Sequence, residues 1–379
     1  MLFCFSFLKS TWFSEGFKEK ISHLCFKIAS YLTDPICKAH EHFRILSLNQ
    51  TLFLKKSIFA LTLLTNTSLS LFTTLPGVAF RAAAINLQPK PYIHATSAHA
   101  EKTLPGCLPE SLLSWNICCI AGGFSISDGG VTPWRERIEP ITNTIIEKDA
   151  DVNCLYEVFD LHSAFYLTEK LKNAGYSHIY YNIGPRGIGV SSGIFIASKY
   201  EIDNLEFSEF EKDLLVGTTK NANKGFVTFD LLSSEKPFAR VFATHLQHSD
   251  QPAYPTKEEI NARNGQMELI MQKIRKQGNI CTILTGDLNL DDNEYDNSSW
   301  KQDFQRKGTK HTWGGDHYCA TLSGKKVSPS LNLDYLLVTN GSAKAFSTQI
   351  VETGFIPEIY ASEALSDHHG LLGTIKVHR

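Results

Sequence analysis

Residues 284–290, LTGDLNL, end an apolar run with a carboxylate and a carboxamide. Asp287 and Asn289 are two residues apart, so in a strand both side chains lie on one face. A charge at the buried end of a strand is costly unless a partner compensates it, which predicts a polar cluster or a bound cation. A simple turn explains the same residues, because Gly-Asp and Asn commonly end strands. The rest of the chain has to distinguish these two interpretations.

Polar residues of the same chemical kind lie in or directly after several other strand-like runs. They are Asn116 in SWNI, Glu157 in LYEVF, His245 in FATHLQ, Asp334 in LDYLL, and Asp367 and His368 in LSDHHGLL. Each one alone is explained by a salt bridge or by a satisfied hydrogen bond in the core. Together they would need a separate partner for every residue, whereas at one shared sheet edge they would satisfy each other and a cation.

The residue types indicate which cation this would be. Carboxylate and carboxamide oxygens without thiolates favour Mg²⁺, or Mn²⁺, over zinc. The nine cysteines include no CxxC pair, which argues against a zinc site, and those in apolar runs are interpreted as small buried hydrophobic residues. Magnesium held by one or two protein carboxylates completes its shell with water and phosphate oxygens. The pattern therefore points to hydrolysis of a phosphate ester.

From Leu112 onward, strand-like and helix-like segments alternate along the chain. Apolar runs predict strands, and apolar residues at helical spacing predict helices. The strands are expected at LLSWNI, DVNCLYEVF, SGIFIAS, GFVTFDLL, ARVFATHL, ICTILTGDLN, LNLDYLLV and LLGTIKV, and the helices after Pro133, at HSAFYLTEKLKNAG and at residues 257–276. This order predicts one α/β domain of two facing sheets over residues 110–379.

The motifs SWNI, YEVF, SGIFIAS, THLQ, GDLN, LDYLL and LSDHHGL occur in this order. In this they resemble the endonuclease/exonuclease/phosphatase superfamily, and the resemblance covers roughly residues 110–379. It implies the DNase I-like fold, a four-layer α/β/β/α sandwich of two facing mixed sheets. In YEVF, Tyr156 stands where many members have Gln, while the glutamate itself is present.

The resemblance also implies which side chains meet the metal and the phosphate. Glu157, aided by Asn116, would hold a Mg²⁺ ion that polarises the phosphate and stabilises the leaving oxygen. Asp367 would complete the metal or water network. His245 would donate a hydrogen bond to the phosphate as negative charge develops on it.

The remaining motif residues are expected to activate water. By the resemblance, His368 would be the general base, and Asp334 would fix its tautomer. Asp287 and Asn289 would orient the attacking water and a phosphate oxygen. His368 is preferred to His369 as the base because it directly follows Ser-Asp, and His369 is expected to be a support or surface residue.

Within the superfamily, the chain most resembles the neutral and bacterial sphingomyelinase C branch. THLQ is followed by ARNGQMELI, which is similar to the Arg-x-x-Gln helix of that branch and places Arg263 and Gln266 there. NKGF resembles its Lys-Gly loop, although Asn223 stands where the loop usually has Asp. Lys224 is accordingly expected either to bind substrate or to be a solvated turn lysine.

The resemblance therefore predicts hydrolysis of sphingomyelin to ceramide and phosphocholine, with a phospholipid head group as the substrate. Three alternatives remain: an endonuclease or exonuclease acting on nucleic acid, an inositol-polyphosphate phosphatase, and a non-catalytic membrane-tethered binding module. The net charge is −2, and residues 1–56 carry eight Lys/Arg against four Asp/Glu. The rest is therefore at −2 − 4 = −6, a mildly acidic body poorly suited to non-specific binding of nucleic acid.

The N-terminal region differs from the rest of the chain. Residues 1–81 are hydrophobic and partly helical in pattern, and residues 57–80 contain no charged residue over 24 positions. This stretch is long enough to span a bilayer, and it also resembles an export signal that would start downstream of Met1. Membrane contact or secretion is expected, with packing of the segment in a cytoplasmic protein as the alternative. Residues 82–109, rich in Ala and Pro, are expected to be a linker.

Overall fold

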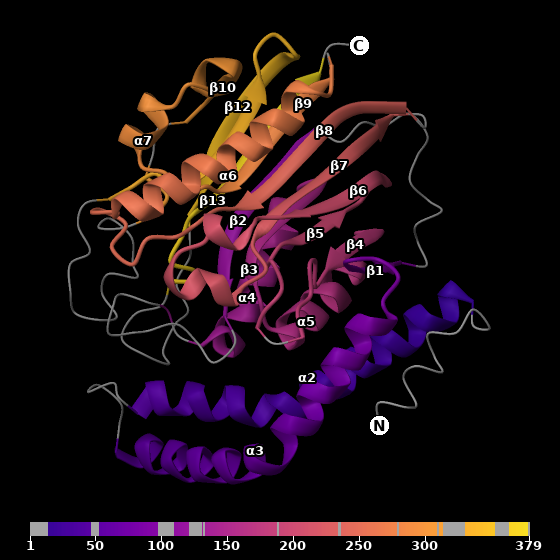
Figure 1. Ribbon diagram of the computed structural model, residues 1–379, viewed down its shortest axis with the longest axis vertical. Coiled ribbons are helices and arrows are strands. Elements are labelled where there is room, and N and C mark those ends of the chain that lie inside the picture. The colour runs from indigo at the N-terminus through magenta and orange to yellow at the C-terminus, as the bar shows by residue number, and fades with distance from the viewer. Residues whose placement is uncertain are drawn as a thin grey trace.

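The computed structural model describes residues 14–46, 53–97, 110–120, 131, 133–187, 189–233, 236–278, 280–308, 311–313, 330–352 and 364–377. Within these residues two mixed sheets face each other, with helices on their outer faces (Figure 1). One apolar cluster fills the space between the sheets, and two others lie between a sheet and its helices. The predicted four-layer α/β/β/α arrangement is confirmed.

The first sheet has seven strands among the described residues, in the order β1-β4-β5-β3-β2-β13-β12. Their bounds are Ile93–Thr96 (β1), Ser111–Cys119 (β2), Val152–Val158 (β3), His178–Tyr181 (β4), Phe195–Ser198 (β5), Ala343–Val351 (β12) and Gly370–Val377 (β13). Helices α4 (Trp134–Lys148) and α5 (Leu161–Asn173) cover its outer face.

The second sheet has six described strands, in the order β10-β11-β9-β8-β7-β6. Their bounds are Ile202–Glu209 (β6), Gly225–Ser233 (β7), Lys236–His245 (β8), Cys281–Asp287 (β9), Phe304–Arg306 (β10) and Asp334–Thr339 (β11). Helix α6 (Lys257–Arg275) packs on its outer face, and the shorter α7 (Asp292–Asn297) follows β9. Short 3-10 turns span Lys212–Leu214 (η3), Gly217–Asn221 (η4) and Lys301–Asp303 (η5).

Alternation along the strands explains how the layers form. In β2, Leu113 and Trp115 pack with the helices, whereas Leu112 packs between the sheets. The side-chain period of two therefore buries both faces of this central strand, which reads as a continuous apolar run. At α6, Thr256 and Glu259 form a capping box that satisfies backbone N–H groups at the helix start.

Strand direction brings the polar strand ends together. In the second sheet β8 runs parallel to β9, and His245 is paired with Asp287 at their carboxyl ends. The antiparallel β11 begins at the same edge, where Asp334 pairs with Asp287. In the first sheet β2 and β3 are also parallel, with Asn116 opposite Tyr156. Both sheets thus present their polar residues at one end of the sandwich.

Two long helices precede the sheets. Helices α2 (Glu15–Leu46) and α3 (Phe53–Leu87) form a hairpin that contains the apolar stretch 57–80. The linker expected at residues 82–109 differs from what is found, because residues 82–87 continue α3 and 93–96 form the edge strand β1, paired with β4. The reason is burial: Ala83, Ala84 and Leu87 pack inside, which the Ala-rich composition did not indicate. Residues 98–109 lie outside the described residues.

The close approach of β8 and β9 depends on Gly286. A Cβ at this position would lie 1.9 Å from the carbonyl oxygen of Thr244, a backbone atom that cannot move without displacing β8. We expect Gly286→Ala to lower the free energy of unfolding by about 1–3 kcal/mol or more through overpacking. Chemical denaturation measures this change. Gly187→Ala is the matched control, since nothing lies within 4 Å of its added methyl group; equal stability of the two variants would contradict the expected clash.

Candidate active site

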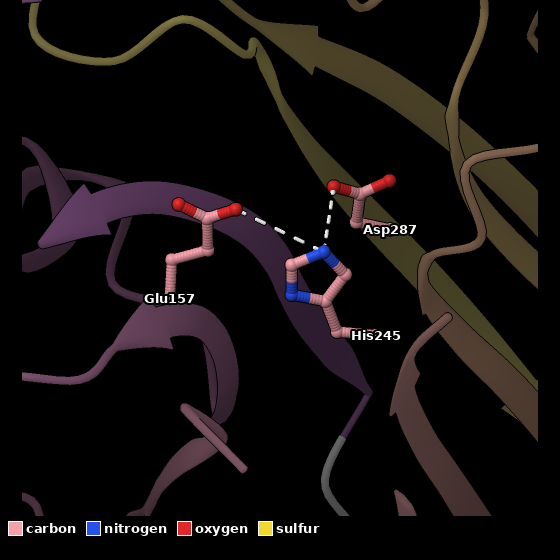
Figure 2. Close-up of side chains that lie close together, drawn as sticks. All are labelled: Glu157, His245 and Asp287. Atoms are coloured by element: carbon pink, nitrogen blue, oxygen red, sulfur yellow. Dashed lines mark ion pairs between the residues drawn. The ribbon is translucent and has the colours of Figure 1, made fainter. Parts of the chain in front are cut away.

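Two overlapping groups of acidic and imidazole side chains occupy the polar edge of the sandwich. Among the described residues, Glu157, His245 and Asp287 offer ligand atoms within 4.8 Å of one another, and so do Asp287, Asp334 and His368. Figure 2 shows Glu157 and Asp287 on either side of the His245 ring, whose Nε2 lies 3.8 Å from Glu157 Oε1 and 3.5 Å from Asp287 Oδ2. Asp287 belongs to both groups and is therefore central to the site.

The carboxylate of Asp287 is held from both sheets. It is 1% exposed, and its Oδ2 accepts a hydrogen bond of 3.0 Å from Asn116 Nδ2 of the first sheet. Its Oδ1 accepts a bond of 3.0 Å from the backbone N–H of Asn289. Asn116 and Asn289, two of the predicted site residues, thus fix the orientation of this carboxylate.

His368 and Asp334 form a tight buried pair. His368 Nδ1 lies 2.7 Å from Asp334 Oδ2, which leaves Nε2 facing Asp287, 3.6 Å from its Oδ2. The indole of Trp115 donates to the backbone carbonyl of His368 at 2.9 Å. The ring is therefore oriented from one nitrogen while the other is directed into the cluster, the arrangement that a general base requires.

The loop that carries His368 is attached to the end of β2. Ser366 Oγ donates to the carbonyl of Asn116 at 2.6 Å, and the backbone N–H of His368 donates to Ser366 Oγ at 3.3 Å. The buried guanidinium of Arg137 donates to the carbonyls of Ile117, Cys118 and Leu365. Arg137 thereby joins the strand end that carries Asn116 to the segment that leads to His368.

The start of β11 is positioned in the same way. The hydroxyl of Thr312 accepts hydrogen bonds from the backbone N–H groups of Leu333 and Asp334, at 3.0 and 3.1 Å. The carbonyl of Thr312 accepts from the backbone of His369. Sequence reasoning missed Thr312, Ser366 and Arg137. Of these three, only Ser366 lies inside a recognised motif, LSDHHGL, from which a role at the site could have been predicted.

Backbone strain also concentrates at this edge. Glu157 and Asn289 have φ values of 61° and 52°, and Cys118, two residues after Asn116, has 49°. Non-glycine residues rarely adopt the left-handed region, and the cost is of order 1–3 kcal/mol each. The fold maintains three such residues where polar side chains converge, as is typical of functional sites.

The electrostatics of the cluster follow from burying several like charges. Burial, together with Asp367, raises the pKa of Glu157 to about 7, and burial raises that of Asp287 to about 6. Burial alone would lower the pKa of His368, but the carboxylates of Asp334, Asp287 and Asp367 raise it well above the usual value. Burial lowers the pKa of His245 well below its usual value, so this ring is neutral. The site holds an excess of carboxylates that additional positive charge would stabilise.

The donor set fits a hard divalent cation. Glu157 and Asp287 supply carboxylate oxygens, and the described part of the chain offers no thiolate beside them in either cluster. Within the same residues, both ring nitrogens of His245, the amide nitrogen of Asn289 and one oxygen of Asp334 are buried without a hydrogen-bond partner. Buried orphan polar atoms around paired carboxylates are expected where an ion, its waters and a substrate bind.

Lys224 is buried beside the cluster rather than solvated in a turn, so the solvated alternative is wrong. It is 3% exposed, and its Nζ donates to the carbonyl of Leu246 at 3.4 Å. Burial lowers its pKa to about 8, a shift that the negative charges of Glu157 and Asp287 oppose. A lysine at this place supplies positive charge to the two carboxylates.

The other predicted residues have different positions. Asp367 is buried, belongs to neither ligand group of the described residues, and has its Oδ1 3.3 Å from Ser366 Oγ. Arg263 pairs with Glu294, its Nε 2.9 Å from Oε2. Gln266 accepts from the backbone N–H of Gln247 at 2.8 Å. The Arg-x-x-Gln helix therefore supports the segment that follows His245.

The charge of Asp334 is expected to hold the proton on His368. In Asp334→Asn the negative charge that stabilises the imidazolium is lost, so the pKa of His368 should fall. An NMR titration of the imidazole C–H resonances measures this, with the His368 signal assigned by its loss in His368→Gln. Asp296→Asn, an exposed carboxylate change, serves as the control. An unchanged pKa in Asp334→Asn would show that the pair does not set the protonation of the ring.

The chain is similar to known proteins in its family and its fold. The model of the endonuclease/exonuclease/phosphatase family matches residues 113–368. A beta toxin variant from Staphylococcus aureus with bound magnesium ions is 20% identical with a TM-score of 0.58, over 71% of this chain and 100% of that one. Sphingomyelinase C from Streptomyces griseocarneus is 19% identical with a TM-score of 0.55, over 72% and 99%.

A third solved structure carries a different activity in its name. Mannosyl-6-phosphatase Bt3783 from Bacteroides thetaiotaomicron VPI-5482 is 18% identical with a TM-score of 0.51, over 70% of this chain and 99% of that one. No curated protein sequence matches the chain. At these identities the solved structures establish the fold, and the family match extends over more than half of the residues. The chain belongs to the endonuclease/exonuclease/phosphatase family and is a phosphoric ester hydrolase.

Proposed function

We propose that the chain is a Mg²⁺-dependent phosphodiesterase that hydrolyses sphingomyelin to ceramide and phosphocholine. The observation that carries the proposal is the meeting of the Glu157–His245–Asp287 group with the His368–Asp334 pair through one shared carboxylate. The substrate is favoured by the resemblance to a sphingomyelinase C and by the mildly acidic body, and the metal by the resemblance to a beta toxin with bound magnesium ions. Nucleic acid and soluble phosphate monoesters are the competing substrates, and the mannosyl-6-phosphatase likeness is the reason to test the latter.

The chain's own residues divide the work of hydrolysis. When bound, Mg²⁺ would be held by Glu157 with Asn116, where it supplies Lewis acidity to the phosphate and its leaving oxygen. Bound Mg²⁺ would also offset part of the negative charge of the carboxylates that raise the pKa of His368. The neutral ring then accepts a proton from water at Nε2, while Asp334 holds Nδ1.

The bond changes are those of a displacement at phosphorus. The water oxygen forms a new P–O bond, and the P–O bond to ceramide breaks. The water proton passes to His368, and the leaving oxygen takes its proton from solvent. Asp287 and Asn289 orient the attacking water. Neutral His245 retains one N–H that can donate to a phosphate oxygen as charge develops.

The substrate class is tested by offering the full chain three phosphate esters. Sphingomyelin vesicles, plasmid DNA and an inositol polyphosphate are incubated with the enzyme, each with Mg²⁺ and with EDTA. The expected result is release of phosphocholine that EDTA abolishes, with the other two substrates unchanged. DNA nicking would identify nucleic acid as the substrate, and release of inorganic phosphate would identify a phosphate monoester. Activity that persists in EDTA would show that the reaction does not need a metal ion.

The base assignment is tested with two adjacent histidines. His368→Ala should lower kcat by about 10²–10⁴-fold, because general base catalysis contributes that much. His369→Ala is the matched control and should change kcat by no more than about twofold, which corresponds to about 0.5 kcal/mol in the barrier. A larger loss in His369→Ala than in His368→Ala would reverse the assignment. Near-identical thermal unfolding of both variants shows that the fold is retained.

A further inference from the structure

The exposed apolar surface of the molecule is concentrated on the N-terminal hairpin. Among the described residues, every large apolar side chain that is exposed lies on α2 or α3, with the exception of Tyr254. On α3 these side chains are 47–77% exposed; they are Ile58, Leu61, Leu64, Leu69, Leu71, Phe72 and Leu75. Soluble monomers rarely expose a contiguous apolar patch of this kind, so the surface requires a partner.

Five polar side chains of this part of α3 are satisfied within the helix itself. The hydroxyls of Thr62, Thr65 and Thr73 donate to backbone carbonyls of the preceding turn, and Ser70 and Asn66 do the same. Residues 57–80 also carry no charge, and these five side chains can enter a hydrocarbon phase with their donors already satisfied. The Ser57–Leu87 helix is also long and apolar enough to cross a membrane.

Helix α2 accompanies α3 along its length. His42 contacts Phe59 near the tip of the hairpin, with ring centroids 5.5 Å apart. Ser22 Oγ donates to the carbonyl of Ala84 at the other end, at 2.8 Å. Between these points Gly77 lies directly against Thr33, where a Cβ would come within 2.7 Å of the Thr33 side chain. The two helices therefore behave as one packed unit.

Charged residues connect α2 to the catalytic domain. Arg135 at the start of α4 pairs with Asp34 at 2.5 Å and with Glu41 at 3.3 Å, and Lys38 pairs with Asp34 at 2.7 Å. Figure 1 shows the outer half of α3 on the far side of α2 from the sheets. Helix α2 thus makes the charged contacts to the catalytic domain, whereas the outer half of α3 presents exposed apolar side chains on the side away from the sheets.

We propose that the outward face of α3, residues 57–75, is a docking surface for a lipid bilayer and lies along it rather than across it. The face supplies many exposed apolar side chains and no charged group, which fits acyl chains. A crossing helix would draw the packed α2 into hydrocarbon with Asp34, Lys38 and Glu41, at high cost. Lying along the surface buries the apolar face while the charges remain with the catalytic domain.

Vesicle flotation tests the surface without using turnover. Full-length protein is mixed with vesicles of phosphatidylcholine alone, which contain no sphingomyelin, and is expected to float with them at low and at high salt. Leu71→Glu with Phe72→Glu should lower the partition coefficient by about a hundredfold, since each apolar side chain contributes about tenfold or more. Tyr254→Glu is the matched control, since Tyr254 is 75% exposed on the catalytic domain, and it should bind as the parent does.

Three results would overturn the docking surface. They are a parent protein that stays in the soluble fraction, a double variant that floats like the parent, and binding that disappears at high salt. Light scattering of the protein without vesicles gives a fourth result that would overturn it. If the parent is a dimer and the double variant is a monomer, the face binds a second copy of the chain instead of a bilayer. Because these substitutions lie at exposed positions, circular dichroism should be unchanged.

The orientation is tested by depth-dependent quenching. Leu64→Trp and Leu75→Trp each introduce an indole on the outward face, one in the middle of the apolar segment and one at its end. Quenching by lipids brominated at different depths should place both indoles at the same shallow depth. A deeper indole at position 64 than at position 75 would mean that the helix crosses the bilayer, and would overturn the proposed orientation.

The inference does not depend on the proposed substrate. Flotation measures binding to vesicles that lack sphingomyelin. A membrane-bound enzyme would therefore float with them whichever phosphate ester it hydrolyses. Vesicle binding without hydrolysis of sphingomyelin would retain the docking surface and remove the proposed function. Hydrolysis of sphingomyelin without vesicle binding would support the proposed function and contradict the docking surface.

Discussion

The buried negative charge of Asp287 is the constraint on which the active site depends. Its carboxylate is held by Asn116 from one sheet and by the backbone of Asn289 from the other, with the rings of His245 and His368 beside it. A carboxylate this deeply buried would take up a proton if these partners were absent. Because they come from several strand ends in two sheets, the same interactions that keep the charge also align the sheets at this edge.

A layer of residues without a chemical role keeps these partners in place. Arg137, Ser366 and Thr312 each satisfy backbone groups of two segments that are distant in the chain. Glu157 and Asn289 have left-handed backbone at the same edge, and such strain persists only where the surrounding structure determines it. Rigidity at the site is therefore a property of the surrounding hydrogen bonds, and the catalytic side chains depend on it for orientation.

The N-terminal hairpin is part of the same structural unit. Phe26 of α2 and Ala84 of α3 join the apolar cluster under the first sheet, and Arg135 connects α4 to Asp34. A surface that holds α3 would consequently hold the catalytic domain at a fixed orientation. This attachment explains why residues 82–87 and 93–96 are a helix end and an edge strand rather than a linker.

The sequence by itself determined the α/β class, the positions of the central strands and the residue types at the site, because apolar periodicity and residue type are local properties. It did not predict the edge strands β1, β6, β10 and β12 or the short β4. It also indicated the apolar segment 57–80. Only the tertiary structure decided that Lys224 is buried beside Glu157 and Asp287, that Arg137 joins the end of β2 to Leu365, and that Asp287 is the residue shared by both groups. These facts depend on contacts between segments up to 228 positions apart, and no local pattern encodes such a contact.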